Sequence, residues 1–341
     1  MAVGVDSDAE VGDARSPKRA RPEWVDRRAA PFRMPGEDEA GEDEGGRMTA
    51  HIALSATLSA EPHPALEALA RAARITDTPC GTGHMVWRAW GEQRPGGKRP
   101  LILLHGGSGS WRHWCRNVLF LNADRLLLVP DLPGLGESAM PDEPFSPDSC
   151  AIALRHGLDT ILPAGARYDL AGFSFGASCA GHLAARDPEG CAALVLVGAA
   201  ALGLTRSRTD LLKVRDKTGA ALMDAHRANL ATLMFADASR IDDVALAIQG
   251  WNTRHARLKS RTFAGTDILL QAVRRSRAPL GVIYGARDAI CYPHVESRLE
   301  LLRAARPGTD ARTVPDAGHW VAYEAADAFN ATLADILTRI G

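Results

Sequence analysis

The sequence predicts an α/β fold, a mostly parallel, doubly wound sheet with a helical cap inserted after its sixth strand. Two observations carry this prediction. After about residue 80, short aliphatic runs alternate with longer stretches of helical pattern, as in chains that wind a parallel sheet between two layers of helices. One helical and charged segment, residues 202–270, interrupts the alternation and is too long for a single crossover.

The expected strands are five aliphatic runs that lack polar alternation. Such strands need cover on both faces, which a parallel sheet flanked by helices provides. The runs are RPLILLH (99–105), RLLLVPD (125–131), RYDLAGF (167–173), ALVLVGA (193–199) and LGVIYGA (280–286). The expected helices cover residues 148–162, 177–187, 295–305 and 324–340. In the last helix, apolar residues recur at helical spacing.

Composition divides the chain into four parts. Residues 1–47 contain no Leu or Ile and cannot bury enough apolar surface to offset their ordering entropy, so a disordered extension is expected. An alternative is that translation begins at Met48, because the Glu and Gly codons before it are purine-rich like a ribosome-binding sequence. The core then covers residues 48–201 and 271–341. Residues 202–270 form the cap over the C-terminal edge of the sheet, where open α/β sheets bind ligands.

Charge and cysteine usage exclude several classes of partner. The 341 residues carry 40 Lys and Arg against 41 Asp and Glu, a balance that predicts no binding to nucleic acid or to an anionic membrane. Six cysteines lack the spacing of a zinc site or a redox pair, so we expect buried thiols, no metal and no other cofactor. The apolar runs are strand-sized, and no basic-then-apolar leader opens the chain. We expect a cytoplasmic protein, a monomer or homo-oligomer, that acts on a small-molecule substrate.

The stretch YDLAGFSFGAS, residues 168–178, places one serine between two phenylalanines and two glycines. Gly172 to Gly176 match G-x-S-x-G, a strained strand-to-helix turn that exposes the hydroxyl of Ser174 above the sheet. The alternative is a purely structural turn. The aliphatic run before the motif and the small-residue helical stretch after it favour the nucleophile.

A nucleophilic serine needs a base, and the base needs an orienting group. His319 lies in VPDAGHW, between a short expected strand and the last helix, and Asp288 directly follows the expected strand at 280–286. The order Ser, Asp, His is typical of this kind of sheet enzyme. Asp131 and Asp316 compete with Asp288 for the orienting role, and a surface or capping histidine is the alternative for His319.

The glycine-rich turn LLHGGSGSW, residues 103–111, follows the first strong strand. We assign the oxyanion-binding donors to the amides of Gly107 and Phe175. Dinucleotide binding is disfavoured, because the turn lacks G-x-G-x-x-G and an acidic ribose partner. The loop PDLPGLGES (130–138) is interpreted as a brace for the strand ends.

Aromatic side chains near these motifs suggest an apolar substrate pocket, although core packing is the commoner fate of such residues. The candidates close to the nucleophile and the histidine are Phe173, Trp111 and Trp320.

Taken in order, LILLHGG, VPDLPGLGES, GFSFGA, YGARD and DAGHW resemble the α/β-hydrolase superfamily over about residues 100–320. The resemblance implies cofactor-free hydrolysis of an ester, thioester, amide or carbon–carbon bond. HGGSGSWRHWCRN and the His319–Trp320 pair are similar to the meta-cleavage product hydrolases. Those enzymes usually carry asparagine before the nucleophile, where this chain has Phe173. Ser174 disfavours haloalkane dehalogenases and epoxide hydrolases, which use aspartate there.

The expected activity is therefore that of a carboxylesterase-like serine hydrolase, in which Ser174, His319 and Asp288 act through an acyl-enzyme. Two alternatives stay open. One is carbon–carbon bond hydrolysis of meta-cleavage products, and the other is a slow-turnover ligand receptor on the same fold.

Overall fold

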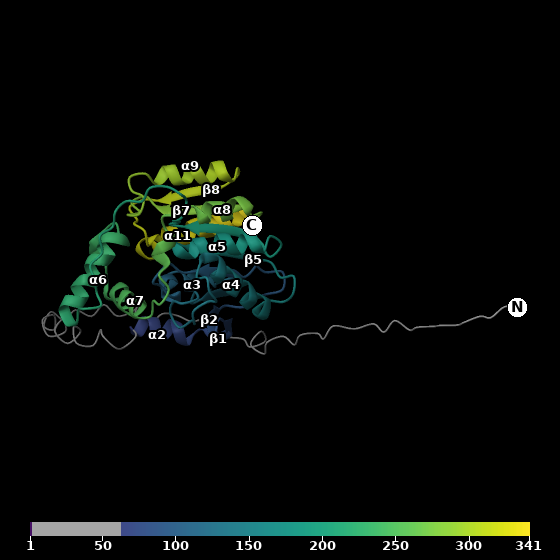
Figure 1. Cartoon of the computed structure of the whole chain (residues 1–341), viewed down its shortest axis with the longest axis horizontal. Coiled ribbons are helices and arrows are strands. Elements are labelled where there is room, and N and C mark those ends of the chain that lie inside the picture. Colours follow the sequence, from purple (N-terminus) through teal and green to yellow (C-terminus); the bar gives the residue numbers. More distant parts are fainter. Residues whose placement is uncertain (2–62) are drawn as a thin grey trace.

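An eight-stranded sheet forms the centre of the protein in the computed structural model, which describes Met1 and residues 63–341 (Figure 1). The predictions for residues 1–47 fall outside the described residues, apart from Met1. The strand order is β1-β2-β4-β3-β5-β6-β7-β8. β1 and β2 form an antiparallel hairpin, β2 pairs antiparallel with β4, and the remaining neighbours are parallel. This mostly parallel sheet with flanking helices confirms the predicted fold class.

The strands are bounded as follows: β1 Arg74–Cys80, β2 Gly83–Trp90, β3 Leu101–Leu104, β4 Leu127–Pro130, β5 Tyr168–Phe173, β6 Cys191–Val197, β7 Leu280–Gly285 and β8 Asp310–Val314. The α-helices are α2 Pro64–Arg71, α3 Val118–Leu121, α4 Pro147–Ile161, α5 Phe175–Arg186, α6 Gly219–Leu233, α7 Asp243–Arg254, α8 Ile268–Arg275, α9 Val295–Ala305, α10 Val321–Glu324 and α11 Ala326–Ile340. Short 3-10 turns are η2 Trp111–Trp114, η3 Ala238–Arg240 and η4 Ser260–Phe263.

Successive side chains of the central strands serve two separate hydrophobic cores, one on each face of the sheet. In β6, Leu194 and Leu196 join the core that contains residues of α4, α5, α8 and α9. Val195 and Val197 join the core that contains residues of α2, α3, α10 and α11. Because both faces are covered, β3, β4 and β6 carry apolar residues at every position, which is the pattern that the sequence showed.

Two helical predictions need adjustment. The expected helix at 324–340 begins two residues later, as α11, because Ala325 (φ −129°, ψ 53°) is not helical and separates α11 from the short α10. The expected cap segment, 202–270, also includes the start of α8. That helix packs on α5, and Leu269 lies where a Cβ on Gly181 would meet it at 2.4 Å.

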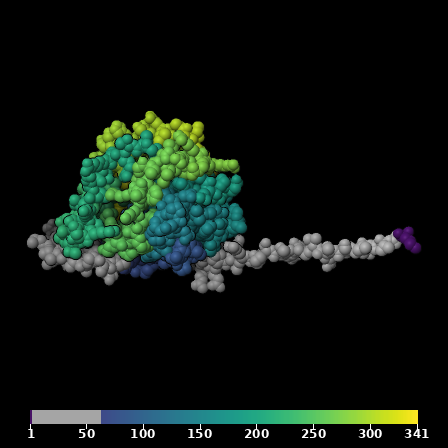
Figure 2. All heavy atoms as spheres, in the orientation of Figure 1, coloured from purple at the N-terminus to yellow at the C-terminus, as the bar shows by residue number. Residues whose placement is uncertain are grey.

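The cap segment itself contains α6, η3, α7 and η4 and follows β6, the sixth strand. Figure 1 shows α6 and α7 on one side of the molecule, set apart from the layer of α4, α5 and α9. Cap residues such as Leu230, Leu246 and Ile248 join the core on the α11 face. In Figure 2 the surface beside α6 is hollowed.

Candidate active site

Ser174 occupies a sharp turn between β5 and α5. Its backbone has φ 53° and ψ −112°, a left-handed conformation that costs a non-glycine residue energy. The Ser174 amide donates to the carbonyl of Val197 at 2.8 Å, which ties the turn to β6. A Cβ on Gly172 would lie 2.3 Å from the Gly176 carbonyl, and one on Gly176 would lie 2.4 Å from the Leu104 carbonyl. Both glycines are therefore required by close backbone approach.

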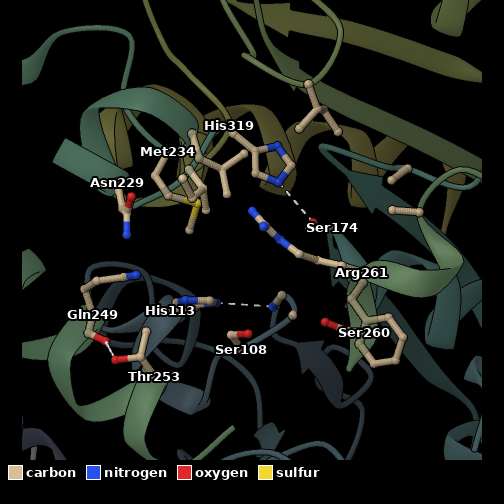
Figure 3. Close-up of a pocket in the computed structure, with 18 of the residues that line it drawn as sticks. Ser108, His113, Ser174, Asn229, Met234, Gln249, Thr253, Ser260, Arg261 and His319 are labelled. Atoms are coloured by element: carbon tan, nitrogen blue, oxygen red, sulfur yellow. Dashed lines mark hydrogen bonds between the residues drawn. The ribbon is translucent and has the colours of Figure 1, made fainter. Parts of the chain in front are cut away.

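The Ser174 hydroxyl is free to react because it does not cap its own helix. Ser174 is the N-cap residue of α5 but makes no side-chain capping bond. Its Oγ instead lies 3.0 Å from Nε2 of His319 (Figure 3).

The imidazole of His319 is held in one tautomer by Asp288. Nδ1 lies 2.9 Å from Oδ2 of Asp288, and both side chains are buried. A carboxylate only accepts hydrogen bonds, so Nδ1 carries the proton and Nε2 presents its lone pair to Ser174. This arrangement allows His319 to remove the serine proton.

Asp288 is fixed on its other oxygen as well. Its Oδ1 accepts a hydrogen bond from the amide of Ile290 at 3.0 Å. The two competing acids lie elsewhere. Asp131 is buried and accepts from the amides of Trp111 and Glu137, at 2.7 and 3.0 Å, so it braces the loop as expected. Asp316 is exposed, and the acid paired with His319 is Asp288.

The loop that carries His319 is anchored by Glu324, a residue that the sequence did not single out. The buried Glu324 carboxylate accepts from the amide of Gly318 at 2.6 Å and from those of Ala236 and Asp237 at 2.8–3.0 Å. The Trp320 amide donates to the Met234 carbonyl at 2.8 Å. The histidine loop is thus joined to the end of α6.

The glycine-rich turn after β3 is held by two buried histidines. His105 Nε2 accepts from the Leu132 amide at 2.8 Å, and His113 Nδ1 accepts from the Gly106 amide at 3.2 Å. Burial lowers the pKa of His105. Burial, together with the neighbouring His105 and His319, holds the pKa of His113 well below its usual range. Both rings are therefore neutral and can accept these amide hydrogen bonds.

Gly107 lies beside the nucleophile on this turn. A Cβ at Gly107 would lie 2.2 Å from Ser260 Oγ and 3.5 Å from the Phe175 Cβ. The cap therefore packs directly on the turn. A hydrogen bond also joins the turn to the cap: Ser110 Oγ donates to Asn252 Oδ1 of α7 at 2.7 Å.

A cavity of about 690 Å³ lies over Ser174 and His319. Its size is that of a small-molecule site. The apolar wall comes from both core and cap, and includes Phe173, Phe175, Leu211, Leu212, Val214, Leu233, Met234, Phe263 and Ile290. Polar and charged lining residues include Ser108, His113, Arg206, Asn229, Gln249, Thr253, Ser260 and Arg261, and Gly107 lines the cavity as well.

The structure places Phe173 on this wall but corrects the expectation for Trp111 and Trp320. Trp111 is buried against Trp90, with ring centroids 5.5 Å apart. Trp320 is buried too, and its indole N–H donates to the His113 carbonyl at 2.9 Å. Their large rings complete the core behind the site.

Other lining and anchoring residues escaped the sequence-based prediction. His113 stands in the quoted stretch WRHW, where a histidine close to a glycine turn was an available signal. Arg206 and Arg261 were hidden among the many charges of the cap segment, and nothing in the sequence marked Glu324.

Within residues 63–341, no group of three or more His, Cys, Asp or Glu side chains is arranged to hold a metal ion. No helix in the same range combines the length and apolar character needed to cross a membrane.

Comparison with known sequences adds a family match. The sequence model described as the alpha/beta hydrolase family matches residues 101–332, more than half of the chain. A Pseudomonas putida protein, the dihydrolipoyllysine-residue acetyltransferase component of the acetoin cleaving system, is 28% identical over 73% of this chain and 66% of its own. The chain thus spans slightly less than two thirds of that relative.

Two more proteins resemble the chain along most of their own length. The 2-hydroxy-6-oxo-6-phenylhexa-2,4-dienoate hydrolase of Burkholderia cepacia is 27% identical over 70% of this chain and 87% of its own. The crystal structure of the enol-lactonase from Burkholderia xenovorans LB400 superposes with a TM-score of 0.62 and 24% identity, covering 77% of this chain and 100% of the lactonase. At that identity the structural likeness concerns the fold.

Proposed function

This chain belongs to the alpha/beta hydrolase family, and on that premise we propose that it is a serine hydrolase that cleaves an ester of a small apolar or aromatic substrate through an acyl-enzyme. The observation that carries the proposal is the continuous hydrogen-bonded series from Asp288 through His319 to Ser174, with donor–acceptor distances of 2.9 and 3.0 Å. Hydrolase chemistry follows from the family. The catalytic role of the triad and the choice of an ester as substrate are what we propose.

The proposed reaction begins when His319 Nε2 takes the proton of Ser174 as Oγ attacks the ester carbonyl. The carbonyl oxygen becomes an oxyanion, and Asp288 stabilises the imidazolium that forms. His319 then gives the proton to the leaving alcohol, and the carbon–oxygen bond of the ester breaks. Water, deprotonated by the same imidazole, attacks the acyl-enzyme; the bond between the acyl carbon and Ser174 Oγ then breaks, the imidazolium returns its proton to Oγ, and the acid leaves.

Two backbone amides are proposed to bind the oxyanion, those of Gly107 and Phe175. Phe175 is the first residue of α5, where amides lack partners within the helix and the helix dipole favours negative charge. Gly107 faces it across the nucleophile turn, and His113 occupies the neighbouring Gly106 amide. Such preorganised donors act where charge develops in the transition state.

A second candidate is hydrolysis of a carbon–carbon bond, because the Burkholderia cepacia relative is named as a dienoate hydrolase. Phe173 argues against it. The phenyl ring lies on the cavity wall, 5.0 Å between centroids from His319, and offers no hydrogen-bond donor to a developing dienolate. We therefore expect ester hydrolysis to exceed cleavage of a meta-cleavage product, and Phe173→Asn to narrow the difference. Faster turnover of the diketone by the unaltered chain would reverse the ranking.

The serine role is tested by labelling and by kinetics together. A fluorophosphonate probe should modify Ser174, as located by peptide mass spectrometry, and Ser174→Ala or His319→Ala should each lower kcat for 4-nitrophenyl acetate by roughly 10⁴ to 10⁶. The double variant should be no slower than the single ones. Ser239→Ala, in an exposed turn of the cap, is the matched control. Full esterase activity in folded Ser174→Ala would disprove the proposal.

A further inference from the structure

Two arginines of the cap segment line the active-site cavity without an acidic partner. Arg206 and Arg261 both lie on the cavity wall. Within residues 63–341 neither guanidinium makes a hydrogen bond or an ion pair, and Nε of Arg206 is buried with no partner. Buried polar groups are ordinarily paired, so an unpaired one in a cavity points to a missing ligand.

Arginines outside the cavity show what the usual arrangement is. Arg99 and Arg125 both bind the buried carboxylate of Asp169, at 2.8 and 2.9 Å. Arg312 is held between Asp310 and Asp335. These three arginines are paired with acids, whereas Arg206 and Arg261, on the cavity wall, are not paired with one within residues 63–341.

The net charge of the cavity lining differs in sign from the net charge of the whole chain. The lining contains four cationic side chains, Arg206, Lys213, Arg215 and Arg261, and one carboxylate, Asp216, so the count is three positive charges in excess. The whole chain carries a formal charge of −1. A concave site lined by one sign of charge concentrates ligands of the opposite sign.

The positive charge of Arg261 also acts on the guanidinium of Arg206. The pKa of Arg206 is lowered, first by burial and then by the positive charge of Arg261, whereas Asp288 acts in the opposite direction. Figure 3 shows the Arg261 side chain extending from η4 into the cavity that holds Ser174 and His319. An anion bound between the two arginines would relieve this repulsion.

The backbone on both sides of Arg206 is anchored. The Thr205 carbonyl accepts from Arg298 at 2.8 Å, and the Ser207 amide donates to the Ile290 carbonyl at 3.1 Å, on the loop that follows Asp288. Arg261 starts from η4, where Ser260 packs against Gly107. Both cations are thus carried by segments fixed to the catalytic loops, and such fixing lowers the entropy cost of binding.

We propose that Arg206 and Arg261 together bind a carboxylate group of the substrate, so that the ester cleaved in this cavity is an acidic one. The inference rests on the proposed serine-hydrolase function. Arginine suits this task because its planar fork donates two parallel hydrogen bonds to a carboxylate. The aliphatic and aromatic wall of the same cavity would hold the apolar part of the substrate.

The kinetic test compares esters that differ only in a terminal charge. One pair is 4-nitrophenyl hydrogen glutarate and 4-nitrophenyl pentanoate, with the charge on the acyl arm. The other is 4-acetoxybenzoate and its methyl ester, with the charge on the leaving group. In at least one pair the anionic ester should have the higher kcat/KM, and added salt should reduce its advantage.

Arg206→Gln and Arg261→Gln should each lower kcat/KM for the favoured anionic ester by about 10- to 100-fold, mainly through KM, as expected for a lost charge-assisted hydrogen bond. The neutral partner should change by less than about threefold. The matched control is Arg208→Gln, because Arg208 is exposed, pairs with Asp210 and lies outside the cavity lining. Equal losses for anionic and neutral esters in folded variants, or no preference in either pair, would overturn the inference.

A binding measurement separates this inference from the proposed reaction. Titration calorimetry with Ser174→Ala should detect glutarate, which has no ester to cleave, and should detect neutral pentanamide at least tenfold more weakly. Adding Arg261→Gln should abolish that difference. If no ester is turned over but glutarate binds in this way, the proposed reaction is refuted and the carboxylate site is supported. If esters are cleaved but glutarate binding does not depend on the arginines, only the proposed carboxylate site is refuted.

Discussion

Replacing Asp288 by asparagine should inactivate the proposed serine hydrolase while Ser174 and His319 stay in place. The structure gives the reason. Oδ1 of Asp288 accepts from the Ile290 amide at 3.0 Å, and Oδ2 faces Nδ1 of His319 at 2.9 Å. An asparagine has one carbonyl oxygen, and the Ile290 amide requires it. The side-chain NH₂ must then face Nδ1 of His319.

That exchange reverses the tautomer of His319. With an NH₂ donor opposite, Nδ1 must accept, so the ring proton moves to Nε2, where it faces Ser174 Oγ. A protonated Nε2 cannot take the serine proton. Water cannot restore the original tautomer, because the His319 and Asp288 side chains are 4% and 0% exposed. The expected loss is about 10⁴ in kcat, or about 5.4 kcal/mol at 1.36 kcal/mol per decade.

The assay is steady-state hydrolysis of 4-nitrophenyl acetate by Asp288→Asn, with circular dichroism and the melting temperature recorded for each protein. Asp316→Asn is the matched control, because Asp316 is exposed and follows β8 in the same part of the chain. Its kcat should stay within about threefold of the parent. A folded Asp288→Asn enzyme that keeps more than a tenth of its kcat would refute the tautomer argument, and an inactive Asp316→Asn enzyme would show that the acid is misassigned.

Three further outcomes are expected. Gly176→Ala should lower the free energy of unfolding by about 1–3 kcal/mol in urea titrations, because its Cβ would lie 2.4–2.5 Å from the carbonyls of Leu104 and His105. Gly265→Ala is the control, because a Cβ there would meet open space, and it should leave the stability unchanged. Equal effects of the two substitutions would contradict the packing argument. Glu324→Gln should cost about 2–3 kcal/mol of stability and also slow the ester reaction, since the carboxylate holds the amides of Gly318, Ala236 and Asp237; unchanged melting would show that these bonds contribute little. The Arg186 guanidinium lowers the pKa of Asp148 to about 2, so the pair stabilises the fold above about pH 4 and is lost as the pH falls through 2. Because Asp148 is 40% exposed, Asp148→Asn should lower the free energy of unfolding by less than about 1 kcal/mol. Calorimetry should find this loss of stability at pH 6 and a smaller loss toward pH 2. A loss that does not depend on pH would refute the assignment.

The sequence by itself determined the five central strands of the sheet. Strands β3 to β7 are buried at every position, so each is a largely apolar run that can be recognised without a structure. The same holds for Ser174, Asp288 and His319. Each follows a strand or motif whose local backbone is set by neighbouring glycines or by the strand end, and the carboxyl ends of parallel strands meet at one edge of the sheet.

Of the two edge strands, the sequence predicted a short strand before His319, where β8 lies, but did not predict β1. β1 alternates between half-exposed and exposed residues along most of its length, and β8 contains the largely polar sequence DARTV. Neither resembles a buried strand, and their pairing depends on a neighbour supplied by the rest of the sheet. The separation of α10 from α11 at Ala325 was likewise invisible to helical periodicity.

Only the tertiary structure decided what surrounds the nucleophile. Trp111 and Trp320 stand beside the glycine-rich turn and His319 in the sequence, yet they are buried in the core, whereas Arg206 and Arg261 come from opposite ends of the cap and both line the cavity. Which way a side chain points and which distant segment it meets depend on helix docking and loop anchoring, such as the bonds of Glu324 and of Ser110. These contacts join residues far apart in the chain, so no local pattern of residues can specify them.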